Sequence, residues 1–213
     1  MLSDSNDVVW RPETITPATE ALLRALHEQG MLADVYLAGG TGLALRFGHR
    51  RSVDLDFVAP AGLDEDQFLQ RLQALPSLVV VARAPQTLHL TIQGIKVSFL
   101  AYQYPMLFPL AVFFGVSVAD PRDIACMKIA AIASRGSRRD FVDLYVVCQR
   151  FGMAELLDLF ARKYARTEYQ KLHILKSLTY FADAEKDPPP HLLVPLHWDQ
   201  IKLYFEHEVP RCW

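Results

Sequence analysis

Two aspartates and a glycine-rich turn are the residues best suited to chemistry in this 213-residue chain. Residues 39–42 read Gly-Gly-Thr-Gly, and Asp54 and Asp56 follow inside an apolar run. Side chains alternate along a strand, so both carboxylates are predicted on one face and the apolar side chains on the other. Adjacent carboxylates repel each other unless a cation lies between them. Mg²⁺ prefers a few carboxylates together with phosphate oxygens, so the pair predicts a metal site.

The turn at 39–42 is predicted to bind an anion. A strand over Val35–Ala38 precedes it, and a short helix over Leu43–Phe47 follows it. Glycines allow a bulky group to approach the backbone because no Cβ intervenes. The first N–H groups of a helix have no partner within the helix and attract negative charge. An anion turn followed by two metal-binding carboxylates indicates a nucleoside triphosphate with its metal.

Each signal alone has a plainer explanation. A Gly-Gly-Thr-Gly turn often binds nothing, and an Asp-x-Asp pair is more often a solvated edge or an ion-pair partner, here of Arg50 and Arg51. The combination of Gly40-Thr41 with Asp54-Leu55-Asp56 is more specific, and it resembles the signature of the DNA polymerase beta superfamily of nucleotidyltransferases. No Gly-Lys-Ser/Thr follows the glycines as in a P-loop. The glycine spacing also differs from the Rossmann fingerprint.

That superfamily usually carries a third acidic residue on the strand beside the Asp-x-Asp strand. The corresponding position here is Ser98, within Lys96–Leu100. Serine does not hold a metal as a carboxylate does. Three explanations stay open: the site is completed from elsewhere, it holds one ion instead of two, or catalysis has been lost.

Lys128 is the sole charged residue from Ile124 to Ser134, in a helix predicted to start at Asp120-Pro121. A lysine in apolar surroundings is rarely buried unless it is paired. One interpretation makes Lys128 a ligand that neutralises the triphosphate. The other is a side chain that reaches from the core to solvent.

Asp140 is the third candidate carboxylate, near the start of the next predicted helix. Ser137 and Asp140 have capping-box spacing, so Asp140 is expected to cap this helix. It is also a candidate to take the proton of an attacking hydroxyl or to bind the metal. Asp143 is predicted to pair with Arg139 one turn earlier.

Four sequence blocks together resemble the AbiEii/AbiGii toxin nucleotidyltransferases over roughly residues 35–150. They are Gly-Gly-Thr, Asp-x-Asp, Asp-Ile-Ala-x-Met-Lys and Arg-Gly-x-x-Arg-Asp-Phe-x-Asp-Leu-Tyr. The resemblance implies a nucleotidyltransferase fold that uses Mg²⁺ (or Mn²⁺). By position it implies catalysis by Asp54, Asp56, Lys128 and Asp140, metal binding by Asp54 and Asp56, and nucleotide binding by Gly39, Gly40, Thr41, Arg51, Lys128 and Asp143.

The resemblance also implies a reaction and partners. A nucleoside monophosphate would move from a nucleoside triphosphate to an acceptor hydroxyl, on RNA such as the tRNA 3′ end or on a protein. The protein would be the toxin of a bacterial toxin–antitoxin or abortive-infection pair, with a cognate antitoxin protein. Ser98 keeps open a non-catalytic nucleotide- or partner-binding protein with a degenerate site. Nucleotidylation of a small molecule also stays open, because it uses the same core.

The expected fold is α+β: a small mixed β-sheet nucleotidyltransferase core covered by helices, with a C-terminal helical lobe. We expect the core over residues 1–119 and the helical lobe over 120–213, packed as one compact unit. The expected strands are 35–38, 53–58, 78–82, 87–92 and 95–100, with a tight hairpin turn at Gln93-Gly94. The expected helices are 17–29, 43–47, 64–75, 120–134, one from 138, 155–164, 169–181 and 198–209.

Composition limits the partners and the location. The net charge of −2 provides no global basic field, so contact with nucleic acid needs a local patch. A locally basic region is formed by Arg162, Lys163, Arg166, Lys171, His173 and Lys176. A solvated helix face is the default interpretation of this region, and an RNA backbone surface is the alternative. Three cysteines without paired spacing and a polar N-terminus without a secretory signal favour the cytoplasm. The most apolar stretch, 106–119, is too short to span a membrane.

Overall fold

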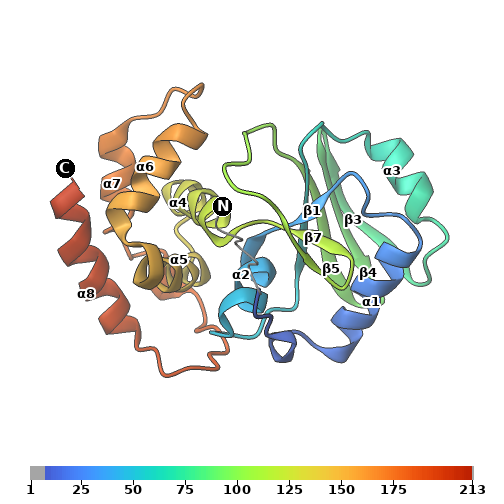
Figure 1. Ribbon diagram of the computed structural model, residues 1–213, viewed down its shortest axis with the longest axis horizontal. Coiled ribbons are helices and arrows are strands. Elements are labelled where there is room, and N and C mark those ends of the chain that lie inside the picture. Colours follow the sequence, from blue (N-terminus) through green and yellow to red (C-terminus); the bar gives the residue numbers. More distant parts are fainter. Residues whose placement is uncertain (1–7, 213) are drawn as a thin grey trace, which may run out of the picture.

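The computed structural model describes residues 8–212, in which one seven-stranded sheet lies beside a group of helices (Figure 1). The strand order is β3-β4-β5-β2-β1-β7-β6. The pairs β1–β7 and β2–β5 are parallel and the others antiparallel, which confirms the predicted mixed sheet. The strands are β1 (Tyr36–Leu37), β2 (Leu55–Ala59), β3 (Leu78–Ala84), β4 (Thr87–Ile92), β5 (Ile95–Ala101), β6 (Ala111–Phe113) and β7 (Val116–Val118).

The helices divide between the two sides of the sheet. In Figure 1, α1 and α3 lie beside the strands on the right, α4–α8 form the group on the left, and α2 lies between. Their bounds are α1 (Pro17–Glu28), α2 (Gly39–Phe47), α3 (Glu65–Leu72), α4 (Pro121–Ser134), α5 (Arg138–Phe151), α6 (Met153–Lys163), α7 (Lys171–Ser177) and α8 (Trp198–Glu208). Among residues 8–212, no helix has the length and apolar composition needed to cross a membrane.

Side-chain caps fix four helix starts where the sequence predicts them. Thr16 accepts a hydrogen bond from the first turn of α1, and Asp64 does the same for α3. Asp120 caps α4, and Ser137 caps α5. A cap supplies an acceptor for a backbone N–H that has no partner within the helix, so these starts are decided locally.

The region around the glycines differs from the prediction. Helix α2 begins at Gly39, so the glycines form its first turn instead of a separate turn before Leu43. Strand β2 begins at Leu55, so Asp54 precedes the strand. The hydroxyl of Thr41 donates to the carbonyl oxygen of Asp54 and so anchors the segment directly before the strand.

The hairpin β6–β7 was not predicted within the apolar run 106–119. Phe114 and Gly115 form its turn with φ of 48° and 81°. Asn-Gly and Asp-Gly are the usual residues in such a turn, and a bulky aromatic residue seldom adopts positive φ. The sequence therefore lacked the common signal for this hairpin.

Alternation along the strands separates the core from the functional face. Phe57 and Phe99 stack at 5.2 Å between ring centroids, within the core shared with α1 and α3. Asp56 and Ser98 are the preceding residues on β2 and β5, so their side chains point to the opposite face, toward the helices α4 and α5. The sheet therefore presents its polar residues toward the helical half.

Two helices bury other apolar residues than their apolar runs alone suggest. The run Ile201–Phe205 would predict Leu203 inside α8, but this residue is 64% exposed. Ile201 and Phe205 form the buried face of α8 at a spacing of four, and Leu203 lies midway between them on the other side. In α1, Leu23 is buried in place of Ala21. Lys163 is buried against Asp123, which removes it from the predicted basic patch.

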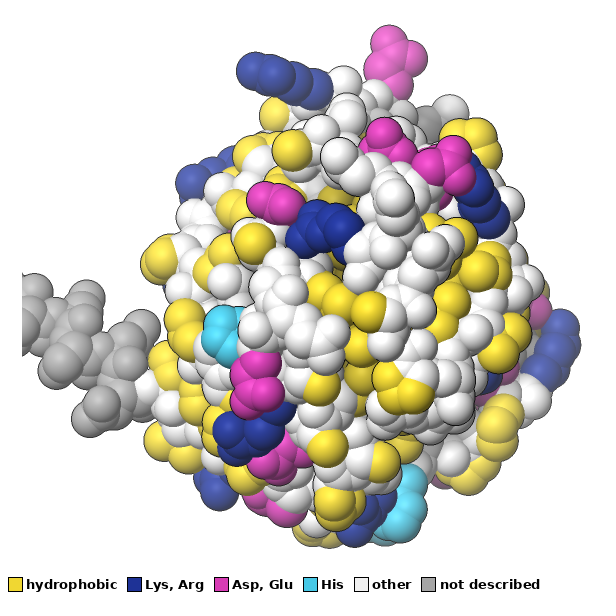
Figure 2. All heavy atoms as spheres, turned by 90° about the vertical axis from the view of Figure 1, so that its right-hand side faces the viewer, with side chains coloured by type: hydrophobic (Ala, Val, Ile, Leu, Met, Phe, Trp, Pro, Cys, Tyr) yellow, Lys and Arg dark blue, Asp and Glu magenta, His cyan; other side chains and the backbone are white. Residues whose placement is uncertain are grey.

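Edge strand β3 leaves apolar side chains at the surface. Val79, Val80 and Val81 are 58%, 43% and 63% exposed. Figure 2 shows the face at the right of Figure 1, where basic side chains lie next to acidic ones with apolar side chains between them. This face therefore carries no broad basic field.

Cys126, Cys148 and Cys212 are free thiols.

Candidate active site

A cavity of about 520 Å³ lies between the polar face of the sheet and helices α4 and α5. The sheet and the segment before β2 supply carboxylates, and the helices supply most of the cations. Six of the predicted site residues line it: Gly39, Gly40, Asp54, Asp56, Lys128 and Asp140. Three predicted site residues do not line it: Thr41, Arg51 and Asp143. The cavity also contains residues that sequence reasoning did not assign to the site: Arg50, His89, Arg135 and Arg139.

Asp56 is a largely buried carboxylate that lacks a cation. Among the described residues, no Lys, Arg or His lies within ion-pair distance of it. Burial raises the pKa of Asp56 above its usual value, and the charge of Asp54 acts in the same direction, while Lys128 opposes them. Asp54 is more exposed and lies 3.6 Å from Arg139 Nη1. The pair therefore has negative charge that the protein does not fully neutralise.

Ser98 lies directly opposite Asp56 across the parallel strands β2 and β5, where the sequence placed it. Its hydroxyl lies 3.0 Å from Nδ1 of His89 on β4, so the three side chains form a row across the sheet. Within residues 8–212, no three His, Cys, Asp or Glu side chains are grouped to hold a metal. Two carboxylates suit Mg²⁺, because Mg²⁺ commonly takes one or two protein carboxylates and completes its octahedron with phosphate oxygens and water.

The first two glycines of α2 are required by protein side chains. A Cβ on Gly39 would lie 2.6 Å from Oδ2 of Asp56, and Gly39 has φ of +61°. A Cβ on Gly40 would lie 2.0 Å from Nη2 of Arg50. The N-cap, Ala38, makes no side-chain cap hydrogen bond, so no cap side chain occupies the start of α2 beside the cavity.

Lys128 is buried between two carboxylates. Its Nζ lies 2.8 Å from Oδ1 of Asp140 and 2.8 Å from Oδ2 of Asp143, and only 8% of the residue is exposed. The alternative of a lysine that reaches solvent is therefore wrong. Burial alone would lower the pKa of Lys128, but the two carboxylates raise it, so the ammonium group is charged. An ammonium group has three N–H donors, which leaves one for the cavity.

Asp143 is fully buried behind the cavity and binds Arg50. The Arg50 guanidinium donates Nε at 2.6 Å and Nη2 at 2.8 Å, and His49 Nε2 lies 2.8 Å away. Although burial raises it, Lys128 and Arg50 hold the pKa of Asp143 well below its usual range. The predicted pair with Arg139 is wrong, because α5 turns Asp143 inward and Arg139 toward the more exposed Asp54.

Asp140 is ionised and fully engaged. It accepts hydrogen bonds from Lys128 Nζ at 2.8 Å, from Arg135 Nε at 3.2 Å and from the Ser137 hydroxyl at 2.7 Å. These donors lower the pKa of Asp140 although burial raises it. The expected link to the Ser137 cap is present, with the Asp140 N–H 3.4 Å from that hydroxyl.

Thr41 and Arg51 lie outside the cavity. Thr41 is 1% exposed, and its hydroxyl bonds to Ser52 Oγ at 2.8 Å and to the Asp54 carbonyl, so it fixes the backbone that carries Asp54. Arg51 is exposed, and its backbone N–H donates to His191. Arg50 occupies the cavity in its place. Two adjacent arginines give the sequence no sign of which one turns inward.

The comparisons with known proteins decide the family. The chain matches the family model described as "Nucleotidyl transferase AbiEii toxin, Type IV TA system" over residues 21–108 and 88–211. The chain belongs to the AbiEii family. It is therefore a transferase of the nucleotidyltransferase class, and the predicted family resemblance is confirmed.

Relatives of this AbiEii protein include sequence and structure matches. The uncharacterized protein aq_aa25 of Aquifex aeolicus (strain VF5) is 36% identical over 186 residues, covering 84% of this chain and 88% of that protein. MenT4, a nucleotidyltransferase toxin of Mycobacterium tuberculosis H37Rv, matches with a TM-score of 0.57 and 17% identity, covering 94% of this chain and 86% of MenT4. JHP933 of Helicobacter pylori matches with a TM-score of 0.53 and 16% identity, covering 95% and 93%. At these identities the two structures show a shared fold.

Proposed function

We propose that this AbiEii protein moves a nucleoside monophosphate from a nucleoside triphosphate to a hydroxyl group of an RNA, such as the 3′ end of tRNA. One observation carries the proposal. The cavity places the carboxylates of Asp54 and Asp56 on one wall and the cations Lys128, Arg135 and Arg139 on the other. Phosphoryl transfer needs positioning and charge neutralisation more than covalent help from the protein, and these two walls supply both.

Asp54 and Asp56 would hold the divalent cation, Mg²⁺ or Mn²⁺. The residues fit it because Asp56 is buried without a cation of its own and Asp54 borders open cavity. When bound, the ion would neutralise phosphate oxygens and help to orient the triphosphate. Gly39 permits the close approach of the Asp56 carboxylate to the start of α2, because a Cβ there would lie 2.6 Å from Oδ2.

The helix wall would bind the triphosphate. Lys128 offers its remaining donor to a phosphate oxygen. Arg135 and Arg139 have side chains 69% and 58% exposed, so they are free to turn toward an incoming anion. Asp140 and Asp143 accept from Lys128 and thereby fix its position. Because Asp140 already accepts three hydrogen bonds and its pKa is lowered, we assign it the placement of Lys128 rather than proton transfer.

The reaction would be an in-line displacement. An acceptor hydroxyl oxygen attacks the α-phosphorus and forms a new P–O bond. The bond from the α-phosphorus to the oxygen bridging to the β-phosphate breaks, and pyrophosphate leaves with that electron pair. The hydroxyl proton passes to water at the cavity mouth. We place the nucleotide between the sheet core (1–119) and the helical lobe (120–213).

The family description supports a biological role as the toxin of a toxin–antitoxin pair, with a cognate antitoxin protein. We propose that the protein acts in the cytoplasm, where nucleoside triphosphates, Mg²⁺ and RNA are available. The three free thiols are consistent with a reducing compartment.

A transfer assay tests the proposal. Purified protein is incubated with each α-³²P-labelled nucleoside triphosphate, Mg²⁺ and total tRNA, and Asp54→Ala serves as the inactive variant. Label in RNA that requires Asp54 supports the proposal and identifies the base. Label on the protein itself, or on an added small molecule, would contradict an RNA acceptor.

Ser98 favours a second candidate, a nucleotide-binding protein without catalysis. The serine stands beside Asp56 where a third carboxylate would extend the metal site. This candidate predicts no transfer by the wild-type protein but a rise in Tm with nucleotide and Mg²⁺. A gain of transfer in Ser98→Asp would show that the site has become degenerate, whereas transfer by the wild type excludes this candidate.

A further inference from the structure

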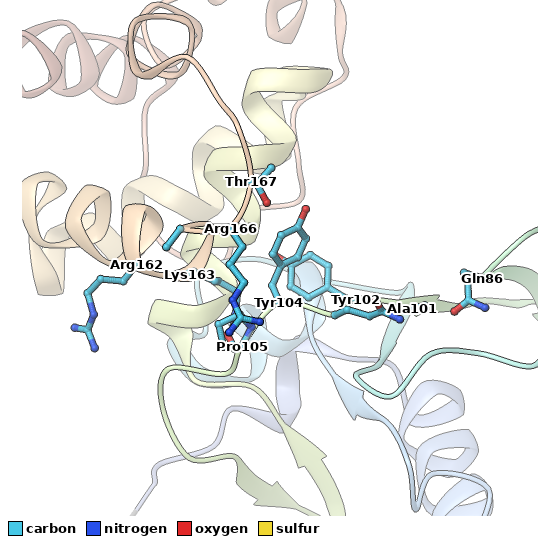
Figure 3. Close-up of a pocket in the computed structure, with 11 residues that line it drawn as sticks. Gln86, Ala101, Tyr102, Tyr104, Pro105, Arg162, Lys163, Arg166 and Thr167 are labelled. Carbon is cyan, nitrogen blue, oxygen red and sulfur yellow. The ribbon is translucent and has the colours of Figure 1, made fainter.

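A second cavity of about 730 Å³ lies beside the active-site cavity, between the segment that follows β5 and the end of α6 (Figure 3). The first wall carries Tyr102, Tyr104 and Pro105, and the second carries Arg162 and Arg166. The charged residues that line it are Arg162, Lys163 and Arg166, all basic. An aromatic wall opposite basic side chains is the combination that binds unpaired nucleotides.

The aromatic wall is rigid. The ring of Tyr104 lies 4.8 Å from that of Tyr102 and 4.5 Å from that of Tyr164, between centroids. The hydroxyl groups of Tyr102 and Tyr164 are hydrogen-bonded to each other. Tyr104 is only half-buried, so part of its ring faces the cavity. A ring held by two others stays in place when a base stacks on it, and little entropy is lost.

A buried ion pair holds the segment that presents Tyr104. Lys163 Nζ donates to the Pro105 carbonyl at 2.8 Å and to Asp123 Oδ1 at 2.6 Å. Asp123 also accepts from the backbone N–H groups of Leu107 and Phe108. This pair lies outside the proposed catalytic arrangement. It fixes Pro105 and the following residues Leu107 and Phe108, and so anchors the segment next to Tyr104.

Because Lys163 is paired with Asp123, the positive charge of the second cavity comes from Arg162 and Arg166. In Figure 3 the Arg166 side chain extends toward Pro105 and Tyr104, whereas Arg162 points away from them. Arg166 is exposed, and no ion-pair partner for it is present among the described residues. It is therefore placed to contact a phosphate of a strand whose base lies on Tyr104.

The two cavities are lined by neighbouring residues of one stretch of chain. Ser98 and Leu100 of β5 line the active-site cavity, and Ala101, the last residue of β5, and Tyr102 line the second. At about 3.3 Å per residue, Tyr102 lies roughly 13 Å from Ser98 along the backbone. One short single strand can therefore occupy the second cavity while its end reaches Asp54 and Asp56.

We propose that the second cavity binds the unpaired nucleotides at the 3′ end of an acceptor RNA, with a base stacked on Tyr104 and a phosphate contacted by Arg166. The inference rests on the proposed function, because it gives that reaction its acceptor. A protein acceptor is less compatible with the cavity, which offers stacking and positive charge but no carboxylate for a basic peptide.

Direct binding tests the cavity independently of catalysis. A short single-stranded oligoribonucleotide, labelled at its 5′ end with fluorescein, is titrated with wild-type protein without nucleotide, and anisotropy is measured. Tyr104→Leu is expected to weaken binding at least fivefold, roughly the lower limit for losing a stacked base. Tyr104→Phe keeps the ring and is expected to bind within about twofold of wild type. Each variant is checked for an unchanged Tm.

Arg166→Gln provides a second variant on an exposed side chain that the fold does not need. It is expected to reduce the salt slope of log K by about 0.7, the value for one phosphate contact on a single strand. Arg211→Gln is the matched control, since Arg211 is exposed and lies on the C-terminal turn after α8. If Lys176→Gln reduces the salt slope as much as Arg166→Gln does, RNA binds a diffuse basic surface and the proposal for the second cavity is overturned.

The outcomes separate this inference from the proposed function. If the wild type does not bind the oligoribonucleotide, or if Tyr104→Leu binds it as well as the wild type, RNA binding by the second cavity is overturned. This holds even if label is transferred to RNA. Binding that depends on Tyr104 in a protein that transfers no label supports the cavity and contradicts the function. Nucleoside triphosphate with Mg²⁺ is expected to raise the Tm of Tyr104→Leu as it does that of the wild type. If this rise is lost in the variant, the ring binds the donor base and the acceptor role is overturned.

Discussion

Asp56 on β2 and Ser98 on β5 are direct neighbours in parallel register, with His89 in register beyond Ser98. The serine adds an oxygen but no charge to the wall that holds the carboxylates. Two negative charges, one of them largely buried, are enough for one Mg²⁺ that takes its other ligands from phosphates and water. The absence of a third acid from this position is therefore compatible with a single-metal site.

Ser98→Asp would place a third carboxylate against Asp56 and Asp54. In the presence of EDTA we expect a loss of about 1–3 kcal/mol in the free energy of unfolding, the range for burying a polar group whose hydrogen bonds to water are not fully replaced. Mg²⁺ should restore part of the lost stability. Urea denaturation with and without Mg²⁺ measures the free energy of unfolding, and Ser98→Asn provides a neutral side chain of similar size. Equal stability of the two variants in EDTA would contradict the geometry.

Asp56→Asn should separate stability from function. Burial raises the pKa of Asp56, so the folded state binds its proton more tightly than the unfolded chain does. The ionised group therefore costs stability, and this cost grows as pH rises above the ordinary value of 3.8. At neutral pH without metal, the variant should equal or exceed the wild type in stability by up to about 1 kcal/mol.

The same variant should lose nucleotide transfer at least about 100-fold, because even groups that only support metal ligands change affinity or activity roughly 10–100-fold. Asp66→Asn is the matched control, since Asp66 is exposed and pairs with Arg83 at the surface. A destabilised Asp56→Asn, or one with full activity, would exclude the metal assignment.

Asp143→Asn should destabilise the fold strongly. It leaves the buried Arg50 and Lys128 without their shared carboxylate, and breaking a buried pair costs about 3–5 kcal/mol. The pKa of Asp143 is lowered in the fold, so its stabilisation is present above pH 3.8 and is lost as pH falls through the lowered value. Urea denaturation between neutral and acidic pH should show a flatter pH dependence for the variant below that point. Parallel curves would contradict this role.

Gly30→Ala is the control for Gly39→Ala, because both glycines have positive φ, +68° for Gly30 and +61° for Gly39. A Cβ at Gly30 meets nothing within 4 Å, so only backbone strain of about 1–2 kcal/mol is expected. A Cβ at Gly39 also displaces the Asp56 carboxylate. We therefore expect the Tm rise caused by nucleotide and Mg²⁺ to disappear in Gly39→Ala and to persist in Gly30→Ala. Loss in both variants would mean that strain alone accounts for the effect.

Lys163→Met should be far more damaging than Lys202→Met. Removal of Lys163 leaves Asp123 buried without its cation, at a cost of about 3–5 kcal/mol. Lys202 pairs with the half-exposed Glu185 at the surface, where solvent screens the pair and it contributes little to stability. Chemical denaturation of both variants measures the difference. Similar losses would show that Asp123 finds another partner.

Local signals made much of the fold predictable. The caps Thr16 and Ser137 are decided by neighbouring residues, and Gln93-Gly94 joins β4 to β5 with positive φ at both positions. The start of α2 was not predictable in this way. Glycine disfavours helix, yet the helix begins at Gly39, where Asp56 and Arg50 lie against the first two glycines. This tertiary contact is contained in no local pattern.

The residues of the candidate site also fall into those with a local sequence signal and those brought in by tertiary contacts. Residue type and spacing identified Asp54, Asp56 and Lys128, which the structure brings to one cavity. His89 enters through strand register, and Arg50 enters through a partner 93 residues away in the sequence. Neither relationship leaves a trace in the neighbouring residues, so a single sequence could not provide them.

The bond between Arg50 and Asp143 also sets an order of events during synthesis. A nascent chain holds Asp54 and Asp56 early, but Lys128 and both of its carboxylates emerge much later, with α4 and α5. A product that terminates before α5 would carry a guanidinium placed for burial with nothing to receive it. A chain that ends before α5 would therefore lack the carboxylate shared by Arg50 and Lys128, and this part of the fold is completed only after α5 has been made.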